Sequence, residues 1–520
     1  MTLKRKPKQY AIASCTREAT SVGVEIAAEG GNAVDSAVGV AFALIVSNIL
    51  MCSIAGGGFA TVRTPEGIVE TIDFFDCMPG KGLNPDYFRK YANPQKVSLP
   101  YGVGIDVMIG HACAGVPGTV KGLELLLERH GTMPLKEVIR PAIEHARKGI
   151  KVSRTISFWL GISAKKVHWY TRYAKKLLST PAGAIPEAGY LLKQKDLADT
   201  LEVIGDYGSD VVYKGDIADA IVQEMQKGGG LITYDDLASY QAIIRKPLYT
   251  EYRGKKVWTN PPPSVGGATL VEMLNIISHL ELGNALTPQM VSAIGKAQRI
   301  ALFDKFTKYL DPKTNEEVSK ELLSPEYAEQ CYKKIVPWPN TTHLSTIDDT
   351  GCAVGITMSM GYGSGVAIPD TGIIMDNVLG EMELNPKGFL QATPGERLIS
   401  GMAPTIMYDD QTSDLVALGT PGASRISTCL MQIIMNLTDF KTDLLTALSS
   451  PRFHFEDSKF ALEPGIEFDP SLIDDNVEIC QFDDLNMYFG GSQSVRFKKG
   501  KLPESATDPR RSGSAQTLIV

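Results

Sequence analysis

Thr341 is the residue whose position in the sequence most suggests chemistry. The proline-rich segment 337–339 before it cannot be helical. Residues 342–348 mix β-branched and apolar types, 349–351 make a turn, and 352–360 have the pattern of a second strand. Thr341 would therefore head a β-hairpin at the end of an exposed loop. A threonine hydroxyl attacks an amide only when a base assists it, and most loop threonines have no catalytic role.

Other reactive side chains show no catalytic or metal-binding spacing. The seven histidines and eight cysteines form no H-E-x-x-H or C-x-x-C pattern, and no G-x-S-x-G occurs. We therefore expect neither a metal nor an organic cofactor. Scattered cysteines in a large chain are usually reduced core residues, and no long apolar stretch follows the basic residues 4–8. Together these features favour a cytoplasmic protein.

Composition and charge are those of a globular protein. The chain has 520 residues, of which 43% are hydrophobic and 21% charged, and its formal net charge is −7. This acidic balance predicts neither a nucleic-acid partner nor an anionic membrane partner. The longest apolar stretch, 33–50, contains Asp35, Ser47 and Asn48, so it is better interpreted as a buried helix than as a membrane span.

Helices and short strands alternate around the candidate threonine. Helices are expected over 20–30, 32–46, 118–130 and 134–148, through most of 150–250, and after the rigid turn 261–267. Pro141 would kink or restart its helix, and Thr233 would cap another. A hairpin is expected over 60–75, and short strands with Gly-Pro turns dominate from Thr341 to about Ser424.

A series of short motifs, each weak by itself, runs through nearly the whole chain in a fixed order. The motifs are Gly31–Asp35, Gly56–Phe59, Gly115–Gly118, Asp236–Tyr240, Tyr252–Gly254, Pro261–Gly267, Asp304 with Asp311-Pro312, Thr341–Ser345, Met402–Thr405, Pro421–Arg425 and Pro451–His454. In this order they resemble the γ-glutamyltranspeptidases, a family of N-terminal-nucleophile hydrolases. The resemblance implies a four-layer αββα sandwich.

The resemblance also implies that the chain cuts itself between Asn340 and Thr341. Thr341 Oγ would attack the Asn340 carbonyl, the acyl group would shift from nitrogen to oxygen, and water would hydrolyse the ester. The products would be a large fragment, 1–340, and a small one, 341–520, which together form one globular unit. The freed α-amine of Thr341, with a pKa near roughly 8, would then act as the base.

Further residues gain expected roles from the same resemblance. Pro421–Arg425 matches a loop whose backbone N–H groups form the oxyanion hole, which assigns that role to Gly422 and Ala423. Ala423 stands where the family has a second glycine. Ser359 would support the nucleophile through its hydroxyl, although an ordinary strand serine is an equal alternative. His343 would be structural and not a base.

The substrate-binding residues depart from the family pattern. Phe75 stands where the family has an arginine that clamps the α-carboxylate of a glutamyl group, and taken alone it is an ordinary strand aromatic. Arg63, Lys81 or Arg89 could replace the missing cation. The other departures, each at a position that binds substrate in the family, are Gly361 for an asparagine, Val378 for an amide residue, Glu381 for an aspartate, and Ser400-Gly401 for a serine pair.

These observations predict an enzyme that hydrolyses an amide, or transfers its acyl group, through an acyl-enzyme on Thr341. The resemblance implies γ-glutamyl substrates such as glutathione, but the altered pocket predicts poor turnover of small γ-glutamyl amides. The alternatives are an acylase acting on another amide or on poly-γ-glutamate, and a non-catalytic protein that only binds a ligand. Expected partners are a small-molecule amide and the chain's own two fragments as a heterodimer, which could assemble further.

Overall fold

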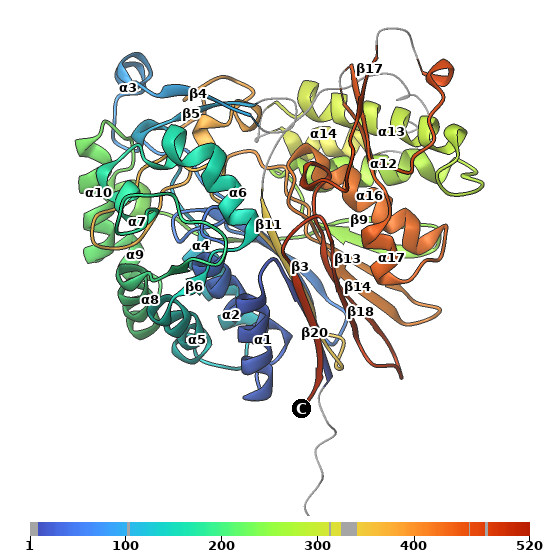
Figure 1. Cartoon of the computed structure of the whole chain (residues 1–520), viewed down its shortest axis with the longest axis horizontal. Coiled ribbons are helices and arrows are strands. Elements are labelled where there is room, and N and C mark those ends of the chain that lie inside the picture. Colours follow the sequence, from blue (N-terminus) through green and yellow to red (C-terminus); the bar gives the residue numbers. More distant parts are fainter. Residues whose placement is uncertain (1–8, 101–104, 311–313, 324–340, 457, 474–476) are drawn as a thin grey trace, which may run out of the picture.

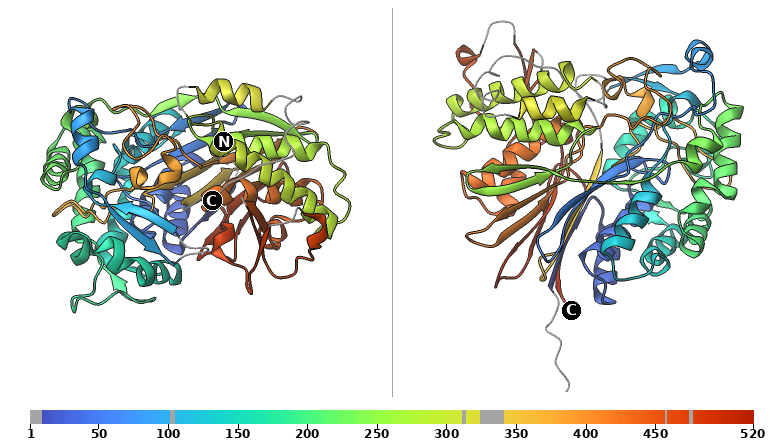
Figure 2. Two further views of the ribbon diagram at one scale, coloured as in Figure 1. Left: turned by 90° about the horizontal axis from the view of Figure 1, so that it is seen from above. Right: turned by 180° about the vertical axis from the view of Figure 1, so that it is seen from behind.

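Two stacked β-sheets form the centre of the molecule, and a layer of helices covers the outer face of each (Figure 1). The structure is a computed structural model that describes residues 9–100, 105–310, 314–323, 341–456, 458–473 and 477–520. The four-layer αββα sandwich expected from the resemblance is confirmed. Figure 2 shows the same layers from above and from behind.

The first sheet carries the predicted hairpin at its centre. Its seven strands, in spatial order, are β20 (Ser514–Ile519), β1 (Gln9–Ser14), β11 (Thr342–Asp348), β12 (Ala353–Ser359), β2 (Gly57–Arg63), β3 (Val69–Asp73) and β8 (Ile243–Arg245). All neighbouring strands in this sheet are antiparallel. The hairpins predicted at 342–360 and 60–75 are both present.

The second sheet lies against the first. Its six strands, in spatial order, are β19 (Glu504–Thr507), β18 (Gln493–Lys498), β14 (Asp414–Leu418), β13 (Thr405–Asp409), β10 (Lys255–Thr259) and β9 (Leu248–Tyr252). Small and β-branched side chains from both sheets, including Ala11, Ile347, Ala417 and Val495, pack together between them. Their small size lets the two sheets approach closely.

Each helical layer packs on one sheet through an apolar face. The first sheet is covered by α1 (Arg17–Ala28), α2 (Ala33–Ser47), α4 (Thr119–His130), α5 (Leu135–Lys148) and α8 (Lys195–Tyr207). The second is covered by α12 (Val265–Ser278), α13 (Pro288–Thr307), α16 (Ser424–Thr438) and α17 (Leu444–Ser449), with α14 (Asn315–Leu322) beside α12. Every residue of α2 is buried, including the polar Asp35, Ser36 and Ser47, in agreement with the buried helix expected from its mainly apolar sequence.

Shorter elements surround the sandwich. The helices are α3 (Pro85–Tyr91), α6 (Arg154–Ser163), α7 (Arg172–Leu177), α9 (Asp210–Tyr213), α10 (Asp216–Lys227) and α11 (Tyr234–Ala238). The strands are β4 (Gln95–Leu99), β5 (Ile105–Ile109), β6 (Ile150–Lys151), β7 (Leu191–Leu192), β15 (Phe453–Glu456), β16 (Lys459–Leu462) and β17 (Glu478–Gln481). Thr233 caps α11 as predicted, and its hydroxyl accepts from the Asp236 N–H.

The structure tests two further expectations from the sequence, one on Pro141 and one on the cysteines. Pro141 does not restart α5, because it lies in one continuous helix from Leu135 to Lys148. All cysteines in the described part of the chain are free thiols, as expected for core residues.

Among the described residues, we find no helix with both the length and the apolar character needed to cross a bilayer.

Both sheets combine strands from the two sides of Thr341. In the first sheet, β11 lies between β1 and β12, and in the second, β13 lies between β10 and β14. Separating 1–340 from 341–520 would therefore break backbone ladders in both sheets. The fragment boundaries themselves stay a prediction, since Asn340 lies outside the described residues.

Candidate active site

Thr341 and Ser359 lie opposite each other at one end of the central hairpin. In the antiparallel register Thr342 pairs with Met358, so one further step places Thr341 across from Ser359. Both residues line one pocket and are almost fully buried. The Ser359 hydroxyl also accepts a hydrogen bond from the Gly361 N–H at 2.8 Å. The strand pairing thus brings together the two hydroxyl residues selected from the sequence.

His343 is held inside the hairpin and is not a base for Thr341. Its Nδ1 lies 2.9 Å from Thr357 Oγ1, and its Nε2 lies 2.9 Å from Ser345 Oγ. Complete burial lowers the pKa of His343 to about 3, so the ring stays neutral. The ring also packs on Gly419, where a Cβ would come within 2.2 Å of it. This contact packs strand β11, which follows Thr341, against the segment that leads to Gly422.

Gly422 and Ala423 form the turn that begins α16. Gly422 has φ +131°, and Ala423, the N-cap of α16, has φ +63° and ψ −117°. Only glycine adopts such a conformation without strain, so Ala423 keeps the glycine geometry at a cost. Within the described residues, neither of the two N–H groups has an acceptor. They lie at the positive end of a helix dipole, a suitable place for a developing oxyanion.

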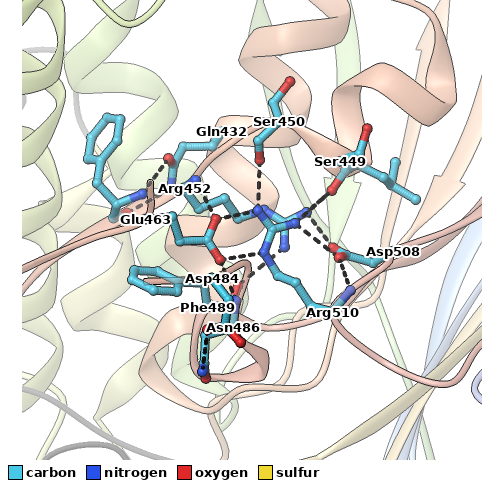
Figure 3. Close-up of polar contacts among 12 residues, drawn as sticks. Gln432, Ser449, Ser450, Arg452, Glu463, Asp484, Asn486, Phe489, Asp508 and Arg510 are labelled. Atoms are coloured by element: carbon cyan, nitrogen blue, oxygen red, sulfur yellow. Dashed lines mark hydrogen bonds and ion pairs between the residues drawn. The ribbon is translucent and has the colours of Figure 1, made fainter. Parts of the chain in front are cut away.

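A second loop supports this turn from behind. Gly490 packs so closely on it that a Cβ there would meet Thr420 Oγ1 at 2.7 Å and the Pro421 carbonyl at 3.0 Å. Arg425 donates to the Tyr488 carbonyl, and Arg452 to the Phe489 carbonyl. Arg452 belongs to a buried ion network with Asp508, Arg510 and Glu463, whose side chains point toward one another in Figure 3.

Phe75 lies in the pocket wall, at the position where the resemblance placed an arginine. Its ring is buried and stacks on Phe59, with centroids 5.7 Å apart. Its carbonyl accepts hydrogen bonds from Tyr240 Oη and Arg397 Nη1. Arg397 is not among the pocket-lining residues, and its guanidinium lies against Asp73. This wall therefore presents an aromatic ring to the pocket.

Two buried carboxyl groups follow Phe75 along the same wall. Asp76 and Asp376 are each 1% exposed and both line the pocket. Burial, and then the charge of Asp376, raises the pKa of Asp76 well above its usual range. Burial likewise raises the pKa of Asp376 to about 7, although the Gly115 and Val378 N–H groups donate to its carboxylate. At neutral pH this pair therefore retains a proton.

Gly361 and Glu381, two of the positions that depart from the family pattern, lie next to each other. A Cβ on Gly361 would lie 1.9 Å from Glu381 Oε1. The longer glutamate thus occupies the room that a side chain at 361 would need, and its Oε1 accepts from the Tyr362 N–H. Val378 begins a short 3-10 turn, Val378–Gly380, and adds an apolar side chain to the same pocket.

Among the described residues that line the pocket, the cation is Lys305, to which no sequence motif pointed. Arg63 donates to the Gly351 carbonyl, Lys81 to Ser239, and Arg89 to the Leu390 carbonyl. None of these three lines the pocket, so that expectation was wrong. Lys305 comes from α13 and is 6% exposed. Its neighbour Asp304 belongs to one of the motifs that carry the family resemblance. That motif was the one signal in the sequence that could have pointed to Lys305.

The pocket as a whole is deep and mainly apolar. Its empty volume is about 710 Å³, including the part open to solvent. The lining includes Thr341, Ser359 and Ala423, which are expected to be catalytic, and Phe75, Glu381 and Ser400-Gly401, which are expected to bind substrate. Met360, Leu384, Ile399, Met402 and Ile426 supply apolar surface. All predicted site residues in the described chain converge here except Gly422, which lies next to Ala423.

Comparison with known proteins agrees with this arrangement. A family model described as gamma-glutamyltranspeptidase matches residues 19–518. A relative named glutathione hydrolase proenzyme from Escherichia coli K12 is 33% identical, over 97% of this chain and 91% of that protein. Acylase ACY 1 proenzyme from Pseudomonas sp. SE83 is 32% identical over 86% of this chain and 83% of that protein.

Solved structures show the same architecture. A cephalosporin acylase from Bacillus halodurans superposes with a TM-score of 0.86 at 26% identity, covering 99% of this chain and 97% of that one. A γ-glutamyltranspeptidase from Helicobacter pylori superposes with a TM-score of 0.55 at 32% identity, covering 61% and 89%. The chain is thus similar both to proteins named for γ-glutamyl chemistry and to proteins named as acylases.

Proposed function

The chain belongs to the γ-glutamyltranspeptidase family, and from that premise we propose that it is a self-processing amide hydrolase or acyltransferase with Thr341 as its nucleophile. The observation that carries the proposal is the convergence of Thr341, Ser359 and the positive-φ turn at Ala423 on one buried pocket. A protein that only binds a ligand has no need of this arrangement.

Processing comes first, because the nitrogen of Thr341 is a peptide amide in the uncut chain. Thr341 Oγ attacks the Asn340 carbonyl carbon, the C–N bond breaks as the acyl group moves to oxygen, and water hydrolyses the ester. The new α-amine, with a pKa near roughly 8, accepts the hydroxyl proton in later turnovers. Relatives named as proenzymes support such a step.

In turnover the nucleophile attacks the substrate amide while the two loop N–H groups bind the oxyanion. The tetrahedral intermediate collapses, the α-ammonium of Thr341 protonates the leaving amine, and an ester to Thr341 remains. Water or a second amine then takes the acyl group. Ser359 orients the nucleophile from the neighbouring strand. Removing a single oxyanion donor typically costs about a hundredfold or more in rate.

A γ-glutamyl amide is one candidate substrate, supported by relatives named glutathione hydrolase proenzyme. An amide with another acyl group is the second candidate. It is favoured by Phe75, which replaces a charged clamp with an aromatic ring, and by the relatives named acylase proenzyme. Poly-γ-glutamate, one of the alternatives considered from the sequence, is chemically also a γ-glutamyl amide.

We further propose that the two fragments stay together as a heterodimer, since strands from both build each sheet. A cytoplasmic location is proposed because the described cysteines are buried or partly buried free thiols. Size-exclusion chromatography coupled to light scattering would measure whether the heterodimer assembles further. Fractionation of the source cells would test the location.

Intact mass spectrometry of the purified protein tests the central proposal. We expect two masses that correspond to 1–340 and 341–520. Incubation with an electrophilic amide analogue should add its mass to the smaller fragment alone. A single uncut chain that nonetheless hydrolyses amides would contradict the assignment of Thr341.

A further inference from the structure

A surface groove between α7 and the start of α8 is lined mainly by positive charge. The charged residues among its described lining are Arg172, Lys175, Lys176, Lys193, Lys195 and Asp196. We propose that this groove binds a chain of glutamyl residues and so holds the carboxylate-rich part of a long amide substrate outside the pocket of Thr341. This inference rests on the proposed function of Thr341 and adds a second binding site, which favours long substrates over short ones.

The positive charge of the groove is not neutralised by neighbouring acids. Among the described residues, only Lys195 pairs with a carboxylate, that of Asp199, and the other four cations do not. Asp196, the acidic residue of the lining, accepts a hydrogen bond from Tyr173 Oη at 2.6 Å. On the neighbouring helix α5, by contrast, the four Lys and Arg side chains each pair with a carboxylate. The groove thus keeps a local positive field in a chain of net charge −7.

Aromatic rings hold two of these cations at the rim of the groove. Lys175 Nζ lies 4.8 Å from the centroid of the Trp169 ring, and Lys176 Nζ lies 5.4 Å from that of Tyr173. Such contacts position an ammonium group without cancelling its charge. Both lysines remain exposed, so their charges are available to an anionic ligand.

The lining of the groove is also partly aliphatic, and this identifies the kind of anion. Leu177, Leu191, Leu192 and Leu197 lie among the cations, and the empty volume is about 1900 Å³, including the part open to solvent. A glutamyl residue carries two methylene groups beside its carboxylate, so a glutamyl chain matches both the leucines and the cations. A phosphodiester chain offers charge with no comparable aliphatic spacers, and a flat membrane surface does not enter a groove.

The groove lies close to the proposed active site along the chain. Gly372 lines the groove and Asp376 lines the pocket of Thr341, so four residues separate the two sites and their Cα atoms are at most about 14 Å apart. The Gly372 N–H donates to Tyr173 Oη, and the Asp376 carboxylate accepts from the Gly115 N–H. Both ends of this segment are thus fastened to the fold. A chain of a few glutamyl residues can span this distance, and binding at two sites raises its effective concentration.

The first test measures binding alone and does not depend on turnover. Fluorescence anisotropy of wild-type enzyme would use labelled α-linked decaglutamate and, as its uncharged analogue, deca(hydroxyethyl-glutamine). We expect decaglutamate to bind about tenfold or more tightly than the analogue, and added salt should weaken its binding. Equal binding of the two chains would overturn the proposal. Tighter binding of decathymidylate or of phosphatidylglycerol vesicles would also overturn it, because the groove would then recognise phosphate.

Charge reversal locates the binding in the groove. Neither Arg172 nor Lys193 makes an ion pair or ring contact among the described residues, so Arg172→Glu combined with Lys193→Glu should fold and should weaken decaglutamate binding about ten- to a hundredfold. The matched control combines Lys499→Glu with Lys501→Glu, an equal charge change at exposed residues after β18 that do not line the groove. It should leave binding within about twofold. Equal weakening by both double variants would overturn the proposal, because only net charge would then matter.

Lys175→Gln combined with Lys176→Gln keeps the test decisive if the first double variant fails to fold. This change removes two positive charges of the rim without adding negative ones, and decaglutamate binding should weaken by about fivefold or more. Unchanged binding in this folded variant would overturn the assignment of the groove.

Turnover separates this inference from the proposed function. As γ-linked chains lengthen from two to ten residues, kcat/KM for release of the terminal residue should rise about tenfold or more. Arg172→Glu combined with Lys193→Glu should remove this rise and leave kcat/KM for a single γ-glutamyl anilide within about threefold. No dependence on chain length would overturn the proposal. Enzyme that binds decaglutamate in the groove but hydrolyses no amide would instead contradict the function proposed for Thr341.

Discussion

Arg452 Nη2 lies 2.5 Å from Asp508 Oδ2, and the two side chains are 2% and 0% exposed. Arg510 extends this pair, since it contacts Asp508 on one side and Glu463 on the other (Figure 3). Arg452 also donates to the carbonyl of Phe489, the residue before Gly490, which packs on the proposed oxyanion turn. The ion network therefore supports the geometry of the proposed active site from outside the pocket.

Removing one member of this buried pair should strongly destabilise the protein. Asp508→Asn leaves Arg452 without its carboxylate partner in a site closed to water, and Arg452→Met leaves Asp508 paired with Arg510 alone. We expect the free energy of unfolding to fall by about 3–5 kcal/mol, measured by urea denaturation. Asp199→Asn, which breaks an exposed pair with Lys195, should cost less than about 1 kcal/mol. If Asp508→Asn and Asp199→Asn lowered the free energy of unfolding equally, the buried network would have no special role.

The same network predicts that the free energy of unfolding depends on pH in the acid range. Burial alone would raise the pKa of Asp508, but Arg452 and Arg510 outweigh burial and hold it below its usual range. A carboxyl with a lowered folded-state pKa stabilises the protein above its unfolded pKa of about 3.9, and this contribution is lost as the pH falls through the folded-state value. Unfolding free energies measured from pH 6 down to 3 should therefore decline more steeply for wild type than for Asp508→Asn.

Thr341→Ala should leave a single full-length chain, because no hydroxyl remains to attack the Asn340 carbonyl. Thr341→Ser should still cleave, since serine supplies the same nucleophilic oxygen. The control is Thr342→Ala, which removes the neighbouring hydroxyl that accepts from Asn48 and should permit cleavage. Intact mass spectrometry after prolonged incubation measures all three. Cleavage of Thr341→Ala at the same bond would show that another group starts the reaction.

The hairpin was predictable because local patterns encode it, whereas the role expected of Thr341 came from the resemblance to a family. β-Branched and apolar residues indicated β11 and β12, and their register follows once the turn at 349–351 is located. Lys305 was not predictable, since its approach to Gly401 depends on how α13 packs across residues far apart in the sequence. The raised pKa values of Asp76 and Asp376 also arise only in the folded chain, because 300 positions separate the two residues.

The strain at Ala423 gives a prediction about stability. A residue with a side chain at positive φ costs about 1–2 kcal/mol, and glycine at the same place loses about 0.5–1 kcal/mol through its greater freedom in the unfolded chain. Ala423→Gly should therefore raise the unfolding free energy by about 0.5–1 kcal/mol and keep kcat within a few-fold, because the N–H group is retained. Ala220→Gly, within the regular helix α10, should instead lower stability by about 1 kcal/mol. Destabilisation by both changes would contradict the strained geometry of the turn.

Asp376 should make the free energy of unfolding change with pH in the opposite direction to Asp508. Burial raises its pKa from the usual value near 4 to about 7, so the folded protein favours the protonated form. For a carboxyl with a raised pKa, stability is highest at low pH and declines as the pH rises from about 4 to about 7, where ionisation in the folded state becomes possible. Asp376→Asn keeps an oxygen that accepts from Gly115 or Val378 but removes the charge. We expect it to increase the unfolding free energy by about 2–4 kcal/mol at pH 8 and to have little effect at pH 4.5. Asp219→Asn, on the exposed surface of α10, should have no such pH-dependent effect. Urea denaturation of the three proteins at both pH values is the measurement, and an equal effect of Asp376→Asn at both would show that this carboxyl does not retain its proton when buried.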